Sequence, residues 1–233
     1  MNFILPDWPA PRGVKSLITT RTGGVSLPPF ESFNLGSHVG DDLQHVSENR
    51  KRLRDVLPSE PKWLNQTHST HVVDLDKAQA FEGDAAFTRK NGIVCAVLTA
   101  DCLPILLAGK GCVGALHAGW RGLASGIVEE TVGAMHDADL IAYLGPAIGQ
   151  DAFEVGEEVR DAFPLESHAF RKGAPGKWHA DLYSIARAKL EKLGIRQVYG
   201  GAYCTHSEHS RFFSYRRSGQ TGRMCSLIWL EED

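Results

Sequence analysis

The sequence lacks long apolar runs and an excess of charge of one sign. The apolar-rich residues 93–109 are interrupted by Asp101 and Pro104, whereas a membrane-spanning helix needs about 20 predominantly apolar residues. The first residues, MNFILPDWPAPRG, show neither the basic region nor the cleavage-site pattern of a secretory signal. The formal net charge is −3, and like charges do not form blocks. We therefore expect no membrane segment and no nucleic-acid partner.

Cysteine is scarce and is not arranged for pairing. The chain has five cysteines, an odd number, and none of them forms a CxxC pair. This argues against a disulfide framework and predicts a reducing compartment, the cytoplasm. Cys95, Cys112 and Cys225 lie inside strand-like apolar runs, where the expected role is that of a small core residue.

Internal repeats and low-complexity linkers are also absent. A chain of 233 residues that is 42% hydrophobic and 23% charged can bury a sizeable core, so we expect a single domain over residues 1–233. Strand-like runs alternate with helical patterns, which favours the α/β class. The prediction is one layered α/β/α domain with a mixed sheet, present as a monomer or a weak homo-oligomer.

Short apolar runs predict strands, and apolar residues at three- and four-residue spacing predict helices. The predicted strands are residues 16–20, 62–64, 72–75, 93–99, 112–116, 140–144, 197–203 and 224–230. The predicted helices are residues 41–57, 122–138, 153–163 and 181–194. Between the first strand and the first helix, a Gly- and Pro-rich segment predicts a long loop, and loops of this length in compact domains are usually functional or mobile.

Three residues of metal-ligating type fall at the ends of strand-like runs. Cys102 follows one run, His117 ends the next, and His68 precedes another; the ends of strands are where open α/β sheets commonly build their sites. Two histidines and one cysteine match the donor set of a catalytic zinc site with an open position for water. Their separations, 34 and 15 residues, are too long for a local zinc-binding loop. A hydrogen-bonded histidine without a metal remains the open alternative for each histidine.

Several separated motifs resemble one bacterial family over essentially the whole chain. They are TRTGGVSLPPFESFNLGSHVGDD, ENRKRL, QTHS, TADCLPILL, HAGWRG, YLGPAIG with FEVGEEV, and FFSYRRSGQTGRM. Together they resemble the laccase-domain, YfiH-like family, now described as purine nucleoside phosphorylases and earlier as multicopper polyphenol oxidases. The resemblance implies an α/β/α-type domain with an arrangement like that of cysteine hydrolases of the deamidating-toxin kind. It also implies metal ligation by His68, Cys102 and His117.

The implied activity is phosphorolysis of adenosine, inosine and 5′-methylthioadenosine to the free base and ribose 1-phosphate or its methylthio analogue, together with deamination of adenosine. Zinc at the three ligands would lower the pKa of a bound water, which would then attack purine C6; copper is the alternative metal. Asp101 and Cys102 are the predicted catalytic residues, with Asp101 carrying the proton. Asp84 is the second candidate for this role, and a turn cap is the alternative for either carboxylate.

Phosphorolysis also needs an anion site close to ribose C1′. Guanidinium groups suit phosphate because they donate two parallel hydrogen bonds, and polar side chains in loops are suited to reading ribose or base. The candidates of both kinds are Arg21, Asn34, His38, Gln66, Arg121, Arg216 and Arg217. For each of them, an ordinary surface or loop residue is the alternative. The expected partners are purine nucleosides and phosphate.

Three other functions are considered. A true laccase needs a blue-copper cysteine and many more copper-binding histidines, yet the ten histidines contain no HxH pair and none adjoins a cysteine. A metal-free hydrolase would use Cys102 as nucleophile and His117 as base, acting on amides such as peptidoglycan precursors. A non-enzymatic binding module would leave the three-ligand set unused. Cys204, His206 and His209 form either a second metal site or a surface loop.

Overall fold

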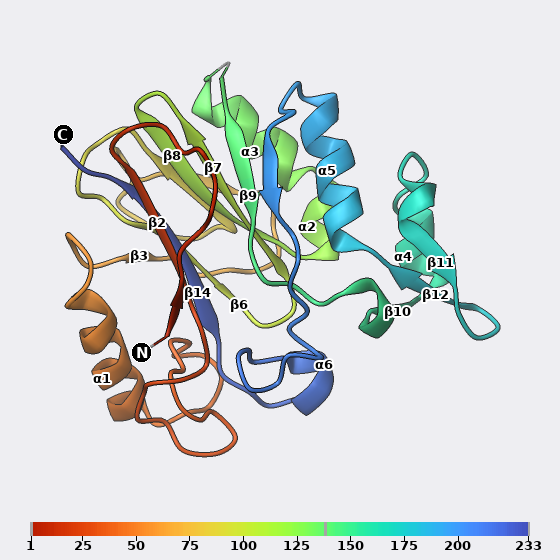
Figure 1. Cartoon of the computed structure of the whole chain (residues 1–233), viewed down its shortest axis with the longest axis horizontal. Helices are drawn as coiled ribbons and strands as arrows, with labels where there is room; N and C mark the ends of the chain where they lie inside the picture. Colours follow the sequence, from red (N-terminus) through yellow and green to blue (C-terminus); the bar gives the residue numbers. More distant parts are fainter. Residues whose placement is uncertain (1, 138, 233) are drawn as a thin grey trace.

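Two mixed sheets that pack face to face form the centre of the molecule, and helices cover their outer faces (Figure 1). The description rests on a computed structural model, which describes residues 2–137 and 139–232. The core between the sheets contains Ile18, Val97 and Ile228 from one sheet and Leu106 and Val113 from the other. Burial of these side chains holds the two sheets together.

The first sheet has the strand order β1-β2-β14-β6-β3. Its strands are β1 (Phe3–Ile4), β2 (Val14–Thr19), β14 (Met224–Leu230), β6 (Cys95–Thr99) and β3 (Lys62–Trp63). Helix α1 (Leu43–Arg54) covers the outer face, where its Leu53 packs with Leu17 and Leu227. Asp42 caps the start of α1 by accepting a hydrogen bond from the Gln44 N–H, as expected for an aspartate at this position.

The second sheet has the strand order β13-β9-β7-β8-β5-β4. Its strands are β13 (Val198–Gly200), β9 (Ile141–Leu144), β7 (Leu103–Gly109), β8 (Cys112–Ala118), β5 (Ala85–Thr88) and β4 (Val72–Asp74). Helices α2 (Trp120–Ser125), α3 (Ile127–Met135) and α5 (Leu182–Lys192) cover its outer face. Together the two sheets and their helices form the layers helix, sheet, sheet, helix.

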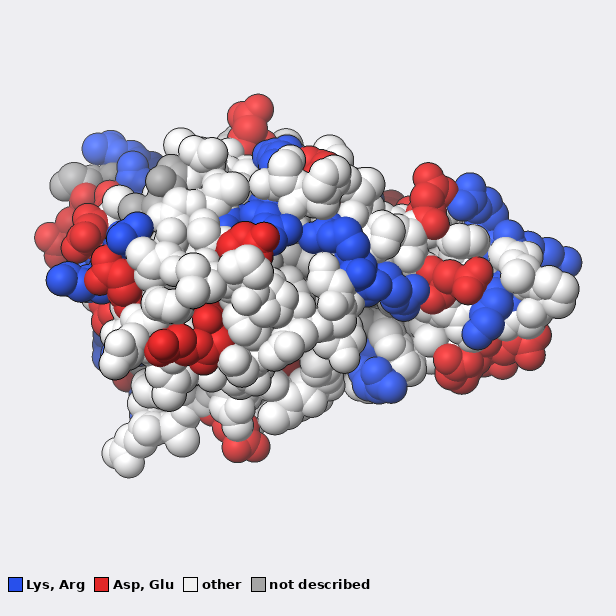
Figure 2. All heavy atoms as spheres, turned by 90° about the horizontal axis from the view of Figure 1, so that it is seen from below, with Lys and Arg blue, Asp and Glu red and all other residues white. Residues whose placement is uncertain are grey.

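A small third sheet projects from one side of the molecule (Figure 1). It consists of β10 (Glu154–Gly156), β12 (Lys177–Ala180) and β11 (Phe170–Lys172), with the short helix α4 (Glu157–Asp161) and two 3-10 turns, Gln150–Ala152 and Ser167–Ala169. Acidic and basic side chains are mixed over this projection (Figure 2). The last helix, α6 (Tyr215–Ser218), lies next to the cavity described below.

The α/β class is confirmed, but the prediction of one sheet between two helical layers is wrong. The strands divide between two sheets, and each apolar strand is covered by helices on one face and by the other sheet on the opposite face: in β7, Ile105 and Leu107 face the helices, whereas Leu106 and Ala108 face the other sheet. An apolar run predicts that both faces are covered. It does not specify whether a helix or a second sheet covers them.

Two predicted helices also differ from the structure. The predicted helix 122–138 is divided into α2 and α3 at Gly126, whose φ of 99° lies in the left-handed region that glycine tolerates; its residue 138 lies outside the described residues. The predicted helix 153–163 begins instead as strand β10, which pairs with β12, and only residues 157–161 are helical. No helix among the described residues has the length and apolar character of a membrane span.

Candidate metal centre

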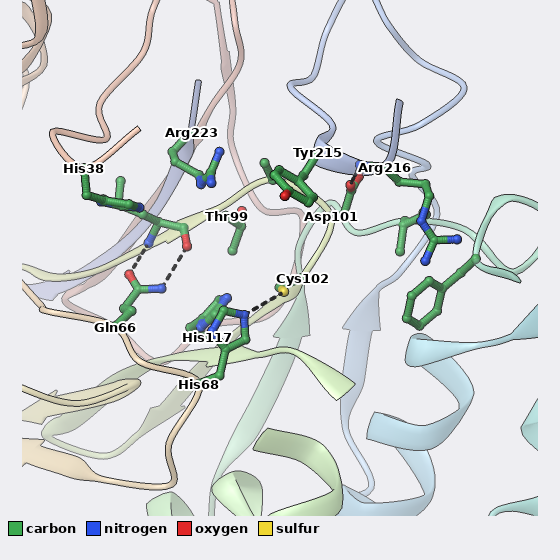
Figure 3. A pocket seen from close by; sticks show the side chains of 14 residues that line it. His38, Gln66, His68, Thr99, Asp101, Cys102, His117, Tyr215, Arg216 and Arg223 are labelled. Carbon is green, nitrogen blue, oxygen red and sulfur yellow. Dashed lines mark hydrogen bonds between the residues drawn. The ribbon is translucent and has the colours of Figure 1, made fainter. Parts of the chain in front are cut away.

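The crossing of the chain from one sheet to the other builds the candidate metal centre. Cys102 lies between β6 of the first sheet and β7 of the second, and His117 is the next-to-last residue of β8. His68 lies in the loop before β4. The ligand atoms of these three residues all lie within 4.8 Å of one another, and Cys102 Sγ is 3.8 Å from His68 Nε2 (Figure 3). The fold therefore brings together three residues that are distant in sequence.

The buried carboxylate of Asp84 holds two of these residues in place. It accepts hydrogen bonds from the backbone N–H groups of Thr67, His68 and Ser69, and its Oδ1 lies 2.8 Å from His117 Nδ1. These bonds hold His68 at a φ of 61°, which is uncommon for a residue with a side chain. With Nδ1 bonded to Asp84, His117 has Nε2 as its ligand atom.

The half-buried Cys102 and the buried His117 and Asp84 shift one another's pKa values. Burial alone would raise the pKa of the Cys102 thiol, but the charge of His117 and hydrogen bonds from His117 and His68 outweigh it and lower that pKa to about 6. Burial likewise opposes the charge of His117, yet Cys102 and Asp84 raise its pKa to about 9. For Asp84, burial is outweighed by hydrogen bonds from His117 and Ser69, which lower the pKa to about 2. At neutral pH the metal-free site therefore favours a thiolate, an imidazolium and a carboxylate.

The donor set and its spacing fit a divalent metal such as zinc. A tetrahedral zinc with bonds of about 2.0–2.3 Å places neighbouring nitrogen and sulfur ligands about 3.5 Å apart, close to the 3.8 Å between Cys102 and His68. The carboxylate bonded to the far side of His117 is the usual second-shell partner of a metal-bound histidine. Among the described residues, this is the single group of three or more His, Cys, Asp or Glu residues found close enough together for one ion.

Gly119, in the HAGW segment, makes room for the metal ligands. A Cβ atom at this position would lie 3.0 Å from Cys102 Sγ and 3.2 Å from His68 Cδ2, closer than the contact distances of about 3.5–4.0 Å. We expect Gly119→Ala to displace a ligand and to weaken metal binding measurably, with little change in thermal unfolding.

A matched control for this prediction is Gly133→Ala, because a Cβ there meets no atom within 4 Å. Gly133 lies inside α3, so this control should keep full metal binding and gain about 0.5–1 kcal/mol of stability. Equal metal affinity in wild type and Gly119→Ala, measured by competition with a chelator, would show that the close approach at Gly119 is unimportant.

The three ligands face a cavity of about 310 Å³. Thr99 and Asp101 line it beside Cys102, and Phe153, Tyr215 and Arg216 contribute a wall that is aromatic and basic. His38, Gln66 and Arg223 line a further part (Figure 3). A second cavity of about 360 Å³ adjoins the first and shares His38, Tyr215 and Arg223 with it. The volume of the first cavity, about 310 Å³, is at the lower end of the range for small-molecule sites.

Four further residues singled out from the sequence line this cavity: His38, Gln66, Asp101 and Arg216. The Gln66 side-chain amide donates to the Leu98 carbonyl and accepts from the Leu98 N–H, at 2.9 and 2.8 Å, which fixes its orientation. The Asp101 carboxylate accepts from Thr205 Oγ1 at 2.6 Å and from the Arg216 N–H at 2.7 Å. Asp101 thus ties the end of β6 to α6.

The other candidates do not line the cavity; these are Asp84, described above, and Arg21, Asn34, Arg121 and Arg217. Arg21 donates to the carbonyls of Glu31 and His209, and Arg217 donates to three carbonyls in residues 205–212. Arg121 is exposed and lies over the ring of Trp120. The metal-ligand group found among the described residues does not include Cys204, His206 or His209.

Sequence reasoning missed four polar or aromatic lining residues, Thr99, Phe153, Tyr215 and Arg223, and the aliphatic residues Leu98, Ala100 and Ile148. Arg223 directly precedes the predicted strand 224–230 and belongs to the segment FFSYRRSGQTGRM, so its place at a strand end was an available signal. Tyr215 is 61% exposed at the rim. An aromatic ring exposed beside a cavity is available for stacking against a ligand.

Fold and site together define an α/β protein with a candidate metal centre in a cavity of small-molecule size. Residues 15–231 match the family model described as multi-copper polyphenol oxidoreductase laccase, and the chain belongs to this family. The resemblance found in the sequence is thereby confirmed.

The relatives extend this similarity over nearly the whole chain. The chain is 49% identical over 241 residues to a protein of Escherichia coli named purine nucleoside phosphorylase YfiH, covering 98% of this chain and 99% of that protein. It is 48% identical over 240 residues to a Pseudomonas aeruginosa protein that is also named purine nucleoside phosphorylase, covering 99% of each. A crystal structure of a Neisseria meningitidis protein superposes with a TM-score of 0.95 at 49% identity, covering 100% of both chains. The structure of YlmD from Geobacillus stearothermophilus has a TM-score of 0.93 at 33% identity, covering 100% of this chain and 97% of that one.

Proposed function

We propose that this protein is a metal-dependent purine nucleoside phosphorylase that acts on adenosine, inosine and 5′-methylthioadenosine and also deaminates adenosine. The observation that carries the proposal is that one cavity combines the His68, Cys102 and His117 group with guanidinium groups and aromatic walls. The names of relatives that are 48–49% identical over nearly their full length support the phosphorylase part of this proposal.

The proposed metal is zinc, with copper as the alternative in the same ligand set. When bound, it would supply a Lewis acid and lower the pKa of a coordinated water. Asp84 orients His117 for ligation through the bond to Nδ1. Asp101 is the proposed proton carrier: its two oxygens each accept one hydrogen bond, and a carboxylate oxygen has acceptor capacity for a second.

Phosphorolysis requires phosphate to attack ribose C1′ while the base departs. Arg216 offers a guanidinium group in the cavity wall, held by a 2.8 Å bond from Nη1 to the Glu154 carbonyl and lying over the ring of Phe153. Phe153 and Tyr215 provide apolar surfaces on which a planar purine packs favourably. These residues position the reactants, and positioning contributes a large part of the rate in such reactions.

Three further expectations accompany this proposal. All five cysteines are free, which supports the cytoplasm as the location. A single domain over residues 1–233 is expected to unfold in one transition in a thermal scan. A monomer or weak homo-oligomer is expected in size-exclusion chromatography.

The proposed function is tested by incubating the purified protein with adenosine in the presence and absence of phosphate. The expected products are adenine and ribose 1-phosphate with phosphate present, and inosine under both conditions. Absence of adenosine turnover under both conditions would contradict the proposal and would favour an enzyme that acts on amide substrates.

The second candidate function is a cysteine amidase acting on peptide-like substrates such as peptidoglycan precursors. The chain of contacts from Asp84 to His117 to Cys102 supports it, since a nucleophile, a base and an orienting carboxylate stand in the order of a catalytic triad. The fold comparison with cysteine hydrolases of the deamidating-toxin kind, expected from the sequence, would accompany this second function.

Alkylation of Cys102 by iodoacetamide distinguishes the two functions. A thiolate bound to metal is shielded, so we expect slow alkylation of the purified protein and rapid alkylation after chelation. In the metal-free protein the rate should reach half its maximum near pH 6, because the pKa of Cys102 is lowered to about 6 from the usual 9.0.

A Cys204→Ser background removes the other partly exposed cysteine from this measurement. Rapid alkylation before chelation, with simultaneous loss of activity, would favour the amidase. A half-maximum near pH 9 would contradict the electrostatic description of the site.

A further inference from the structure

Arg223 lies in the wall between the two cavities. It lines the cavity of the candidate metal centre and also the neighbouring cavity of about 360 Å³. His38 and Tyr215 likewise line both cavities. In the close-up view its guanidinium group points into the first cavity from the side opposite His68 (Figure 3). A ligand in either cavity can therefore reach it.

The Arg223 guanidinium is fixed in place, and among the described residues no carboxylate lies within ion-pair distance of it; the anionic groups that act on it most strongly are Cys102 and Asp101. Its Nη1 donates to the carbonyls of Thr221 and Gly222, at 2.9 and 3.0 Å. Within residues 2–137 and 139–232, its Nε and Nη2 have no hydrogen-bond acceptor, and Arg223 forms no ion pair. By contrast, surface arginines such as Arg171 pair with a carboxylate, here Asp151 at 2.6 Å. Arg223 thus keeps donors and charge available.

The backbone around Arg223 is built to hold it. Asn34 is fully buried, and its Oδ1 accepts from the N–H groups of Arg223 and Gly36, both at 2.9 Å. Gly36 allows the stem of Arg223 to pass, since a Cβ there would lie 2.8 Å from Arg223 Cγ. The structure therefore gives Asn34, a nucleoside-binding candidate in the sequence, the task of positioning Arg223.

Keeping this charge partly buried is costly. Burial lowers the pKa of the Arg223 guanidinium, which means that removal from water disfavours its charged form, and the opposing effect of Cys102 and Asp101 offsets this only in part. An anion bound to Nε and Nη2 would repay this cost by forming two parallel charge-assisted hydrogen bonds. The adjoining His38 and Thr99 provide further hydrogen-bonding groups in the same cavity.

The geometry points to a phosphoryl-binding subsite centred on Arg223, at the junction of the two cavities. The ligand is a dianionic phosphoryl group, which comes either from orthophosphate or from the 5′-phosphate of a nucleotide whose nucleoside part occupies the first cavity. The orthophosphate source rests on the proposed phosphorolysis. Binding itself does not depend on turnover, so the two proposals can fail separately.

The test is calorimetric titration of the purified protein, at measured metal content, with orthophosphate. We expect Arg223→Gln to weaken phosphate binding at least 10-fold and Arg223→Lys, which keeps the charge but loses the fork, to weaken it less. Arg171→Gln is the matched control, because this exposed arginine lies outside the cavities, and it should bind as wild type. Gly36→Ala, which displaces the Arg223 stem without removing its charge, should also weaken binding and serves if Arg223→Gln fails to fold.

Titrations with adenosine and adenosine 5′-monophosphate identify the source of the phosphoryl group. Tighter binding of the nucleotide than of adenosine in wild type, lost in Arg223→Gln, assigns the subsite to a 5′-phosphate. Arg223-dependent orthophosphate binding that persists with adenosine bound assigns it to the co-substrate. If neither ligand is affected by Arg223→Gln at equal metal content, the subsite is refuted and Arg223 serves as a counter-charge for Cys102. Arg223-dependent phosphate binding without nucleoside turnover would refute the proposed function alone.

Discussion

Replacing Cys102 by alanine is expected to leave the purified protein without bound metal and without deamination of adenosine. The same result is expected for His68→Ala and for His117→Ala, because a site with three protein ligands has no ligand to spare. The loss of activity should exceed the roughly 10- to 100-fold that removal of an outer-shell partner costs. His68 is exposed and Cys102 is half-buried, so these two variants should remain folded without loss of stability; His117→Ala should also fold but lose some stability, because His117 is buried and contacts the Asp84 carboxylate.

Metal content by mass spectrometry, together with circular dichroism, checks this prediction. Cys204→Ala is the matched control, since Cys204 is also partly exposed and lies outside the ligand group; it should retain wild-type metal content. Full metal retention in any one of the three variants would remove that residue from the ligand set.

The second large effect is expected for Asp84→Asn. The carboxylate accepts bonds from three backbone N–H groups and contacts His117, and an amide replaces one acceptor oxygen by a donor that faces other donors. An unsatisfied buried donor costs about 1–3 kcal/mol, and loss of the partner of a metal-bound histidine weakens metal binding about 10- to 100-fold. Both stability and metal affinity should therefore fall.

Thermal unfolding and metal competition measure the two effects, and Asp151→Asn, at an exposed carboxylate, is the control. The pH dependence gives a further check. The pKa of Asp84 is about 2 in the folded protein against 3.8 normally. The contribution of the ionised Asp84 carboxylate to the free energy of unfolding is therefore fully present above about pH 4 and is lost as the pH falls toward 2. Asp84→Asn should lack this component, and wild-type metal affinity in the variant would contradict the role assigned to Asp84.

The sequence predicted the element types better than their arrangement. The helix α1 and the closing strand β14 follow from clear periodicity and caps, and the structure contains both. The strand β7 was not predicted, although it is central in its sheet; Pro104 within it reads as a strand breaker, and the structure places Pro104 opposite His117 in the β7–β8 pair. The division into two sheets depends on which apolar face packs against which, and the local apolar pattern does not specify these long-range contacts.

The part of the site that depends on residue type, the metal ligands, could be predicted from the sequence. His68, Cys102 and His117 were selected because metal-ligating side chains at strand ends are unusual, and the structure brings their ligand atoms together. The arginines were harder because a guanidinium also donates hydrogen bonds to backbone carbonyls, so an arginine in the sequence does not by itself indicate a phosphate site. Arg217 turns its donors to main-chain carbonyls, whereas Arg223 keeps donors toward the cavity. That difference depends on contacts made by residues far apart in the chain.

The measurement that tests the account most directly follows adenosine cleavage by protein of known metal content, before chelation, after chelation and after zinc is restored. The account predicts phosphate-dependent release of adenine and ribose 1-phosphate that is lost on chelation and returns with one zinc per chain. Cleavage that continues unchanged in metal-free protein would contradict the role of the His68, Cys102 and His117 group as a catalytic metal centre.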